Sequence, residues 1–279
     1  MTQHTQSFAD LGLSPELLRA VGDAGYDHPT PIQEKSIPLV FMGRDILGCA
    51  QTGTGKTAAF SLPIIDILSQ GRARARMPRA LVLSPTRELA HQISDNFSTY
   101  NKFQDLGQAV LIGGESMPDQ ERALAKDPDV IIATPGRLLD MFERGKLMLG
   151  GVKILVIDEA DRMLEKGFEE DIKNIIGCTS RQRQTLMFTA TWPKEVRELA
   201  ATFMNKAVKV SIGNRDELAA NKRITQTVEV MDPRDKERRL LQLLRQYGDQ
   251  KMLVFALYKK EATRVEAMLR RSGFNVAAI

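Results

Sequence analysis

The sequence has little cysteine and no long apolar run, and both shortages limit the class of protein that it can encode. Only Cys49 and Cys178 occur, far apart in the chain, which excludes a disulfide framework and a cysteine-rich zinc site. We expect both to be buried small residues rather than reactive thiols. No run approaches the roughly 18 apolar residues of a membrane-spanning helix, and the polar first residues lack the apolar stretch of a secretory signal. These absences predict a soluble protein that does not bind membranes and works in the cytoplasm, or in the nucleus if its source is eukaryotic.

The sequence also has almost no excess of positive over negative charge. The formal net charge is only +4, which permits nucleic-acid binding but is too small to argue for it alone. Hydrophobic residues make up 43% and charged residues 27%, the balance of a globular protein with a sizeable core. At 279 residues the chain exceeds the usual 100–200 residues of one domain, so we expect one full domain and part of another.

Short apolar runs alternate with longer amphipathic segments over the first 212 residues, the pattern of parallel strands joined by crossover helices. Most of the runs are apolar throughout, as expected for strands covered by helices on both faces. Residues 1–212 are therefore predicted to form one doubly wound α/β domain, with Ser14 and Pro15 capping and starting a short leading helix. The predicted strands are Ile46–Ala50, Ala80–Ser84, Ala109–Ile112, Val130–Ala133, Ile154–Ile157, Thr185–Phe188 and Val208–Ile212.

A polar stretch over residues 213–224 is the predicted linker, and residues 225–279 begin a second round of the pattern. This round should contain helices Lys236–Gln246 and Glu261–Arg271. It should also contain strands Thr225–Val230 and Met252–Phe255 and a last strand starting near Val276. Because two helices cannot cover both faces of a parallel sheet, this incomplete domain should expose apolar surface unless it packs on the first. The basic run 72–76 is interpreted as a solvated loop rather than a nucleic-acid contact.

The segment after the first predicted strand has the composition of a phosphate-binding loop in its strand, loop and helix setting. Glycines let successive backbone N–H groups point at phosphate oxygens, and the following helix adds its positive N-terminal end. The lysine suits the outer phosphates and the final threonine suits Mg²⁺, which predicts nucleoside triphosphate binding. The general pattern begins with glycine where this chain has alanine. The loop consists of Ala50, Gln51, Thr52, Gly53, Thr54, Gly55, Lys56 and Thr57.

A carboxylate pair, Asp158 and Glu159, follows the apolar run Ile154–Ile157 at the end of a predicted buried strand, where α/β sheets place their ligands. Such a strand end also fits a helix cap or a surface loop. Together with the phosphate-binding loop it favours a hydrolytic site, in which Asp158 holds Mg²⁺ through water and Glu159 orients and deprotonates the attacking water.

The run Asp158-Glu159-Ala160-Asp161 and the other motifs, in order across nearly all of the first domain, resemble the DEAD-box ATP-dependent RNA helicases. The resemblance implies a RecA-like first domain, the start of a truncated second RecA-like domain, and ATP with Mg²⁺ as cofactors. It also implies that residues 8–33 read adenine, which favours ATP over GTP: an amide with a donor and an acceptor suits the base edge. In that segment Gln33 would bond the base and Phe8 would stack on it, with Tyr26 and Thr30 in the same motif.

The resemblance further implies RNA contacts in turns that follow predicted strands, all along one rim. Hydroxyls, exposed N–H groups and arginines suit the sugar-phosphate backbone, so binding should be independent of base sequence. Each turn alone also fits a simple strand-to-helix cap. The implied RNA contacts are Pro85, Thr86, Arg87, Gly113, Gly114, Thr134, Pro135, Gly136 and Arg137. Thr189-Ala190-Thr191 stands where the family has Ser-Ala-Thr, thought to couple hydrolysis to strand separation, so Thr189, Thr191 and Asp161 join Lys56, Asp158 and Glu159 as candidate catalytic residues.

The predicted function is an ATP-dependent RNA helicase that remodels or unwinds RNA. The arginine-rich motif that the family's second domain brings to the ATP phosphates is missing from the sequence, and such arginines contribute about 10³–10⁵ in rate. This chain alone should therefore bind nucleotide, bind RNA weakly and show little unwinding. The alternatives are a non-catalytic module that binds ATP or RNA, and a P-loop enzyme acting on DNA or on no nucleic acid. The sequence identifies no protein partner.

Overall fold

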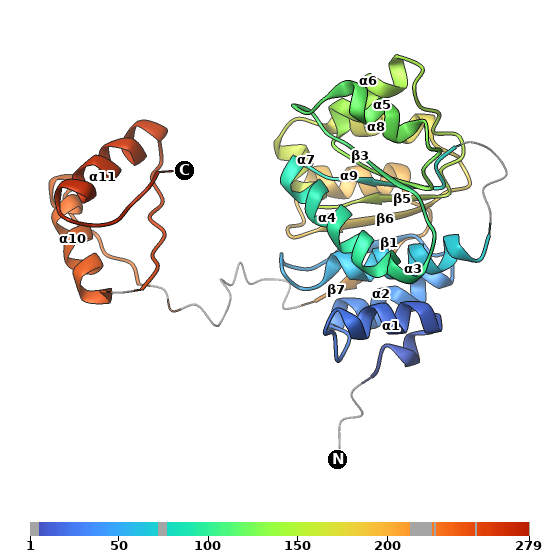
Figure 1. Ribbon diagram of the computed structural model, residues 1–279, viewed down its shortest axis with the longest axis horizontal. Helices are drawn as coiled ribbons and strands as arrows, with labels where there is room; N and C mark the ends of the chain where they lie inside the picture. The colour runs from blue at the N-terminus through green and yellow to red at the C-terminus, as the bar shows by residue number, and fades with distance from the viewer. Residues whose placement is uncertain (1–5, 72–76, 213–224, 226, 249, 279) are drawn as a thin grey trace. The chain divides into compact units, whose positions relative to one another are not determined.

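The computed structural model describes residues 6–71, 77–212, 225, 227–248 and 250–278 (Figure 1). Its internal contacts divide the chain into two compact units, Met1–Asp216 and Glu217–Ile279. The division falls inside the predicted linker 213–224. Both that linker and the basic run 72–76 lie outside the described residues, so the predictions made for them stay predictions. Among the helices of the described ranges, none has the length and apolar content that crossing a bilayer requires.

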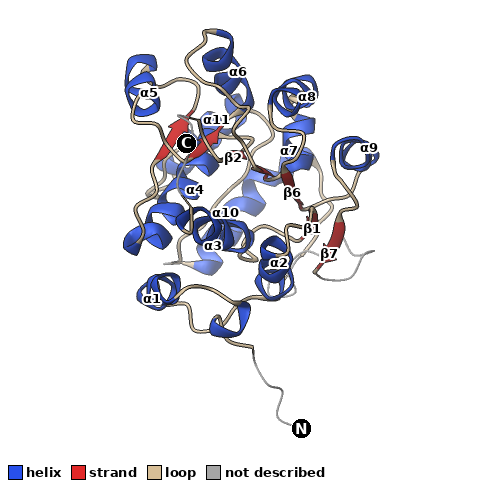
Figure 2. Cartoon of the chain, turned by 90° about the vertical axis from the view of Figure 1, so that its right-hand side faces the viewer, coloured by secondary structure: helices blue, strands red, loops and turns tan. Residues whose placement is uncertain are grey.

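The first unit is built on a seven-stranded sheet in the order β3-β4-β2-β5-β6-β1-β7, and every recorded pairing is parallel. This confirms the predicted doubly wound α/β fold and all seven strands, with no strand end shifted by more than one residue. The strands, red in Figure 2, are β1 Ile46–Cys49, β2 Ala80–Leu83, β3 Gln108–Leu111, β4 Val130–Ala133, β5 Ile154–Ile157, β6 Gln184–Thr189 and β7 Val208–Ser211.

Two apolar cores lie on opposite faces of the sheet because successive strand side chains point to opposite sides. In β5, for example, Ile154 and Val156 join one core and Leu155 and Ile157 join the other. The first core is covered by η1 Ala9–Leu11, α1 Pro15–Asp23, α2 Pro31–Phe41, α3 Lys56–Ser69 and α4 Arg87–Tyr100, which η2 Asn101–Phe103 follows. The second is covered by α5 Met117–Leu124, α6 Pro135–Glu143, α7 Ala160–Glu165, α8 Glu169–Cys178 and α9 Lys194–Phe203.

The strand order decides which loops meet. Because all strands are parallel, the loops that follow them lie along one edge of the sheet, the carboxyl edge. Strands β5, β6 and β1 are consecutive in the sheet, so the acidic motif, the Thr189 motif and the phosphate-binding loop are neighbours. Strands β2, β4 and β3 continue the same edge beside β5 and carry the predicted RNA-contacting turns. One edge therefore holds both groups of predicted site residues.

Two local predictions for the first unit need correction. The leading helix begins at Pro15 as predicted, but the Ser14 hydroxyl makes no capping bond. Instead its backbone N–H donates to Oδ2 of the buried Asp66 in α3 at 3.0 Å, because that carboxylate reaches the chain just before the helix. Cys49 and Cys178 are each partly exposed, not buried, since each is the last residue of its strand or helix. Burial still raises the pKa of Cys178.

The second unit contains the two predicted helices, as α10 Lys236–Tyr247 and α11 Lys259–Arg271, after the short turn η3 Pro233–Asp235. Leu244 and Leu269 are its buried apolar side chains in the described ranges. An ion pair between Arg264 and Glu237 (2.5 Å) joins α11 to α10.

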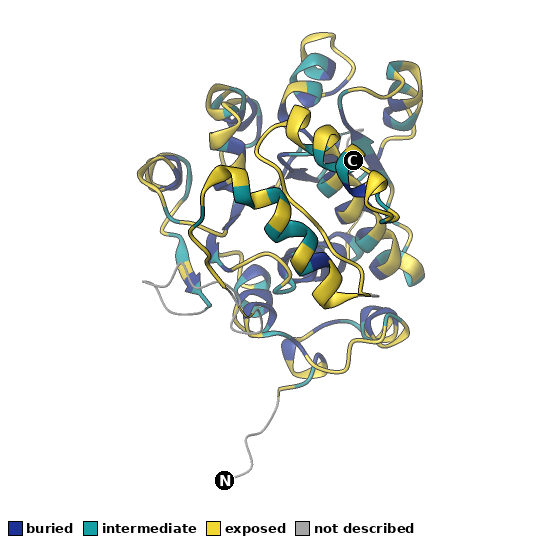
Figure 3. Ribbon diagram, turned by 90° about the vertical axis from the view of Figure 1, so that its left-hand side faces the viewer, coloured by how far each residue is buried: buried dark blue, intermediate teal, exposed yellow. Residues whose placement is uncertain are grey.

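The predicted strands of the second unit are wrong for the residues that the structure describes there, all of which are helix, turn or loop (Figure 2). A parallel strand needs a hydrogen-bonded neighbour about 4.8 Å away, and this short unit supplies no neighbouring ladder. The apolar residues that were to form strands are exposed instead (Figure 3), including Val230 at 98% and Phe255 at 91%. The expected exposed apolar surface is therefore confirmed within this unit.

Candidate functional site

The loop between β1 and α3 has the backbone of a phosphate cradle. Gly53 and Gly55 adopt φ of 80° and 90°, a left-handed conformation that residues with a side chain avoid. At Gly55 a side chain would also collide with the amide of Gln33. Lys56 begins α3 and is 6% exposed, and its Nζ donates to the carbonyl of Ala50 at 3.1 Å. The lysine thus lies across the loop, while Gln51, near the start of the loop, is exposed.

The predicted adenine-reading segment is tied to this loop through Gln33. Its Oε1 accepts from the backbone N–H of Thr30 at 2.9 Å, and its Nε2 donates to the carbonyl of Gly55 at 3.1 Å. The structure therefore brings Gln33 and Thr30 to the loop. Phe8 is 5% exposed inside the first core, and the Tyr26 hydroxyl hydrogen-bonds that of Tyr100 at 3.1 Å. Base stacking by Phe8 and base recognition by Gln33 stay predictions.

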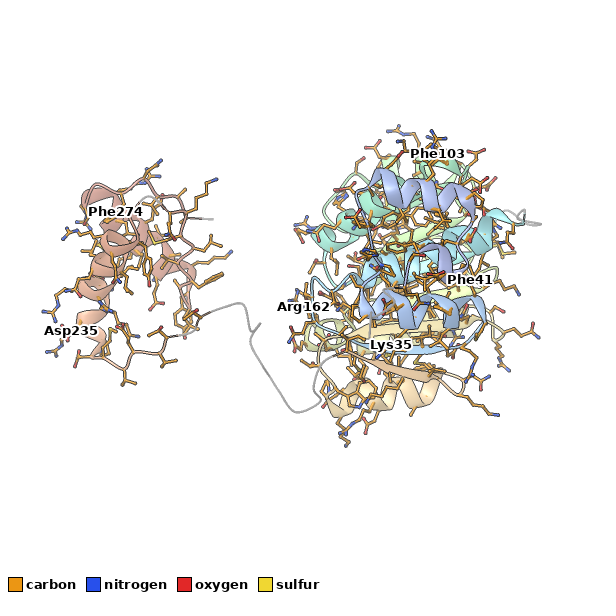
Figure 4. The ribbon with its side chains drawn as sticks, turned by 90° about the horizontal axis from the view of Figure 1, so that it is seen from below. Lys35, Phe41, Phe103, Arg162, Asp235 and Phe274 are labelled. Atoms are coloured by element: carbon orange, nitrogen blue, oxygen red, sulfur yellow. The ribbon has the colours of Figure 1, made fainter. Side chains whose placement is uncertain are left out.

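The acidic motif stands at the end of β5 in a strained turn. Glu159 has φ 52° and ψ 52°, a left-handed conformation that costs a non-glycine residue about 1–3 kcal/mol and is found mainly at functional sites. Its backbone N–H donates to Oδ1 of Asp158 at 3.0 Å. Nη1 of Arg162, labelled in Figure 4, lies 3.1 Å from Oε2 of Glu159, although not in hydrogen-bonding geometry. The turn places both residues at the carboxyl edge of the sheet, directly after β5.

The carboxyl of Asp158 is 2% exposed, and burial raises its pKa to about 6. The charge of Lys56 opposes this rise and the charge of Glu159 adds to it. Burial therefore disfavours the ionised form in the nucleotide-free protein, as expected of a carboxylate that binds a cation.

Asp158→Asn should stabilise the nucleotide-free protein at neutral pH. The raised pKa means that the native state holds more protons than the unfolded state between about pH 4 and pH 6, so stability falls as pH rises through that range. A shift from 3.8 to about 6 corresponds to roughly 3 kcal/mol above pH 6, which the neutral amide recovers. Urea unfolding at about pH 7.5 should show the gain, and unfolding at about pH 4 should not. The same change at the exposed Asp105 is the control, and an equal gain at both pH values would contradict the assignment.

Asp161 joins the acidic motif to the loop after β6. Its Oδ2 accepts from the backbone N–H of Thr191 at 2.8 Å and from the Thr191 hydroxyl at 2.7 Å. The Thr189 hydroxyl donates in turn to the carbonyl of Thr191 at 2.7 Å. Burial alone would raise the pKa of Asp161, but these hydrogen bonds outweigh burial and hold the pKa below its usual value. Two of the predicted catalytic motifs are thus in direct contact.

The predicted RNA rim is assembled in part. Nη1 of the exposed Arg87 donates to the carbonyl of Gly113 at 3.5 Å, and Gly114, at φ 79°, leaves no room for a side chain beside that guanidinium. Arg137 donates to the carbonyl of Glu115 in the same loop at 3.4 Å. Two arginines from different helices therefore converge on the loop after β3.

The remaining rim residues divide by exposure. Gly136 is exposed, and Thr86 is half-buried with its hydroxyl accepting from Leu89 N–H at 3.2 Å to cap α4. Pro85, Thr134 and Pro135 are buried, so they shape the turns and do not offer side chains to a ligand.

Sequence reasoning missed two residues on this rim. His91 Nε2 lies 2.9 Å from Oε1 of Glu115, and both side chains are 48% exposed. His91 follows Arg87 by one helical turn on α4, which is the signal that could have placed it on the same face.

The arrangement fits a triphosphate with Mg²⁺. Oε2 of Glu159 and Oδ1 of Asp161 are buried acceptors without a hydrogen-bond donor, so the site offers oxygen atoms that the protein itself leaves unsatisfied. The described residues contain no cluster of three or more acidic, histidine or cysteine side chains that would hold a metal unaided. Mg²⁺ is commonly held by one or two carboxylates plus phosphate and water, which matches Asp158 with the partly exposed Thr57 at the start of α3.

Comparison with known proteins places the chain among helicases. The family model described as DEAD/DEAH box helicase matches residues 30–199. The chain is 67% identical over 255 residues to the ATP-dependent RNA helicase DBP3 of Meyerozyma guilliermondii, covering 91% of this chain and 47% of that protein. It is 55% identical over 279 residues to the protein of the same name from Candida glabrata, covering 98% and 51%.

A solved structure has the same fold. The crystal structure of a DEAD box protein from the hyperthermophile Methanococcus jannaschii aligns with a TM-score of 0.70 and 34% identity, covering 98% of this chain and 72% of that one. The chain spans about half the length of the curated relatives it matches. From the extent of the match and the identity to these proteins, the chain belongs to the DEAD/DEAH box helicase family.

Proposed function

We propose that the protein to which this chain belongs is an ATP-dependent RNA helicase, and that the chain supplies its nucleotide site and part of its RNA site. One observation carries the proposal: the phosphate loop, the acidic motif and the Thr189 motif lie on adjacent strands, with Asp161 hydrogen-bonded to Thr191. Through these hydrogen bonds, a movement of the acidic motif would also move the loop after β6. The names of the yeast relatives support the same activity.

The nucleotide chemistry follows from the placement of charge. Bound ATP supplies the bond to be broken, and Mg²⁺ supplies positive charge for its phosphates. The backbone N–H groups of residues 51–55 and the ammonium of Lys56 would hold the phosphates, while Thr57 and Asp158 would hold the metal. Glu159 accepts the proton of the attacking water, for which its strained turn aims it at the open edge. Asp161, which is hydrogen-bonded to Thr191, would transmit a shift of the acidic motif to Thr191 and Thr189.

RNA would bind along the second half of the carboxyl edge. The guanidinium groups of Arg87 and Arg137, held over the loop after β3, suit phosphate oxygens. Glycine at Gly113, Gly114 and Gly136 lets the sugar-phosphate backbone approach the chain closely. No base-reading side chain is needed, so we propose binding without sequence preference. Unwinding is attributed to the whole protein, and nucleotide and RNA binding to this chain.

RNA-stimulated ATP hydrolysis tests the function. We expect the phosphate release rate of the protein to rise on adding single-stranded RNA and to stay at its basal level with DNA of the same length. Hydrolysis that DNA stimulates equally would contradict an RNA-specific motor. Tight nucleotide and RNA binding with no stimulated hydrolysis, even in the full-length protein, would leave the non-catalytic binding module as the better description.

Lys56→Ala should weaken nucleotide binding by about 10- to 150-fold, since one charge-assisted contact contributes about 1.5–3 kcal/mol. Fluorescence anisotropy of a labelled adenine nucleotide measures this. Lys166→Ala, which removes an exposed lysine at the end of α7, is the matched control and should change nothing. Unchanged nucleotide affinity in Lys56→Ala would show that this loop does not bind the phosphates, and the proposed ATP hydrolysis would then have no nucleotide site.

A further inference from the structure

A row of cations lies at the edge of the sheet opposite the proposed active site. Arg79, Lys153 and Arg183 immediately precede β2, β5 and β6, and Arg44 and Lys206 stand two residues before β1 and β7. Because β2, β5, β6, β1 and β7 are consecutive in the sheet, these five side chains belong to one continuous amino edge. Separated by up to 162 residues in sequence, they form no visible cluster in the primary structure.

Part of this charge serves the fold. Arg79 pairs with Asp129 at 2.7 Å. Nη1 and Nη2 of Arg183 donate to the carbonyls of Ser180 (3.2 Å) and Phe203 (3.3 Å), just after α8 and at the end of α9, where helix dipoles favour positive charge. These contacts account for two of the cations without any ligand.

A third cation, Arg44, donates through Nη2 to the carbonyl of Lys206 at 3.2 Å, whereas Lys153, Lys206 and the nearby Arg181 have no such contact in the described ranges. The side chains of Lys153, Arg181 and Lys206 are exposed and make no hydrogen bond or ion pair within the described parts of the chain. The carboxylate among them, Asp45, is already occupied, since its oxygens accept from the backbone N–H groups of Thr185 (2.8 Å) and Asn205 (2.6 Å). The single negative charge of Asp45, which acts on Arg183, is outnumbered by the cations around it, so this edge carries an excess of positive charge.

These cations line a hollow. The amino-edge groove has a volume of about 970 Å³ and is lined by Arg44, Lys153, Arg181, Arg183 and Lys206, together with the aromatic rings of Phe41 and Phe203. Both rings are half-buried, and Phe41, labelled in Figure 4, ends α2. Nε of Arg183 is buried and has no acceptor within the described chain. Cations, an unsatisfied donor and partly exposed rings thus share one open groove.

We propose that the amino-edge groove is a second binding site for single-stranded RNA, separate from the carboxyl-edge rim. Free ammonium and guanidinium groups suit phosphodiester oxygens, and the partly exposed aromatic rings of Phe41 and Phe203 suit contact with bases. Those rings favour RNA over an acidic peptide, which offers charge without planar groups. Because the groove and the rim lie at opposite ends of the strands, the two sites hold different segments of one RNA and raise its affinity by multivalency.

The test compares two variants with the same change in charge. Lys153→Glu with Arg181→Glu alters the groove, whereas Lys126→Glu with Lys166→Glu alters exposed lysines elsewhere on the first unit. Anisotropy of a labelled unstructured RNA of about 20 nucleotides, measured without nucleotide over a salt series, gives affinity and salt dependence. We expect only the groove variant to lose about 10-fold in affinity and to show a salt slope smaller by roughly 1.4, the value for two lost phosphate contacts.

Three outcomes would overturn the proposal: no RNA binding by the parent chain at low salt, equal losses in both double variants, or displacement of the RNA by polyglutamate of equal charge as efficiently as by unlabelled RNA. The last would assign the groove to acidic protein segments. Labelled-nucleotide affinity should be unchanged in the groove variant, which separates failure of this site from failure of the proposed ATPase. Photo-cross-linking with thiouridine RNA should mark peptides of the groove in the parent chain and lose them in the variant.

Discussion

Glu159→Gln should lower RNA-stimulated ATP turnover by about 10²–10⁴-fold, the range for loss of a general base, and should leave nucleotide affinity near that of the unaltered protein. Glutamine keeps the shape of the side chain but cannot accept the proton of water. The carboxylate is 5% exposed and sits in a left-handed turn at the end of β5, so another residue cannot easily take its place. Phosphate release and labelled-nucleotide anisotropy on the same preparation separate turnover from binding.

Glu165→Gln is the matched control for this prediction, because it makes the same change on an exposed glutamate of α7. Its turnover should equal that of the unaltered chain. The ion pair between Glu159 and Arg162 involves a 56% exposed arginine, so its loss should barely alter stability. A melting temperature far below that of the control would show that the carboxylate is structural. Full turnover in Glu159→Gln would show that it is not the base.

Much of the first unit could be predicted because its signals are local. A run such as Val130–Ala133, apolar at every position, is typical of a strand covered on both faces, and this one is buried throughout. The phosphate loop was equally readable, since Gly53, Gly55 and Lys56 sit at fixed spacing between a strand and a helix. For the same reason the turn at Asp158 and Glu159 could be placed at a strand end.

What could not be predicted depends on which strands are neighbours. The charge of Lys56, about a hundred residues earlier, counteracts the rise that burial causes in the pKa of Asp158, and the proximity of these two residues follows from the placement of β6 between β5 and β1. The amino-edge groove was invisible for the same reason. The strands predicted near Val230 and Phe255 were wrong for a related reason. Their apolar pattern is typical of strands, but a strand forms only where a neighbouring strand is present to pair with it.

Phe188→Ala should destabilise the first unit by about 3–5 kcal/mol, the cost of removing a large buried aromatic side chain. Phe188 lies in β6, is 0% exposed, and packs against Phe60 of α3 with ring centroids 5.5 Å apart. It also fills the space over Gly48 of β1. Strand β1 and helix α3 hold the phosphate loop between them, so a cavity at this point should also reduce nucleotide affinity. Urea unfolding followed by the fluorescence of Trp192 measures the stability change.

A double-mutant cycle with Gly48 shows whether that packing is the cause. A Cβ on Gly48 would lie 2.5 Å from Cδ1 of Phe188, so Gly48→Ala alone overpacks the core and should cost about 1–3 kcal/mol. In the double variant with Phe188→Ala, the added methyl enters the cavity. The loss of stability in the double variant should therefore be smaller than the sum of the two single losses by more than about 0.5 kcal/mol. Costs that simply add would mean that the ring does not set the spacing of β1 and β6. The phosphate loop would then depend on some other contact for its position.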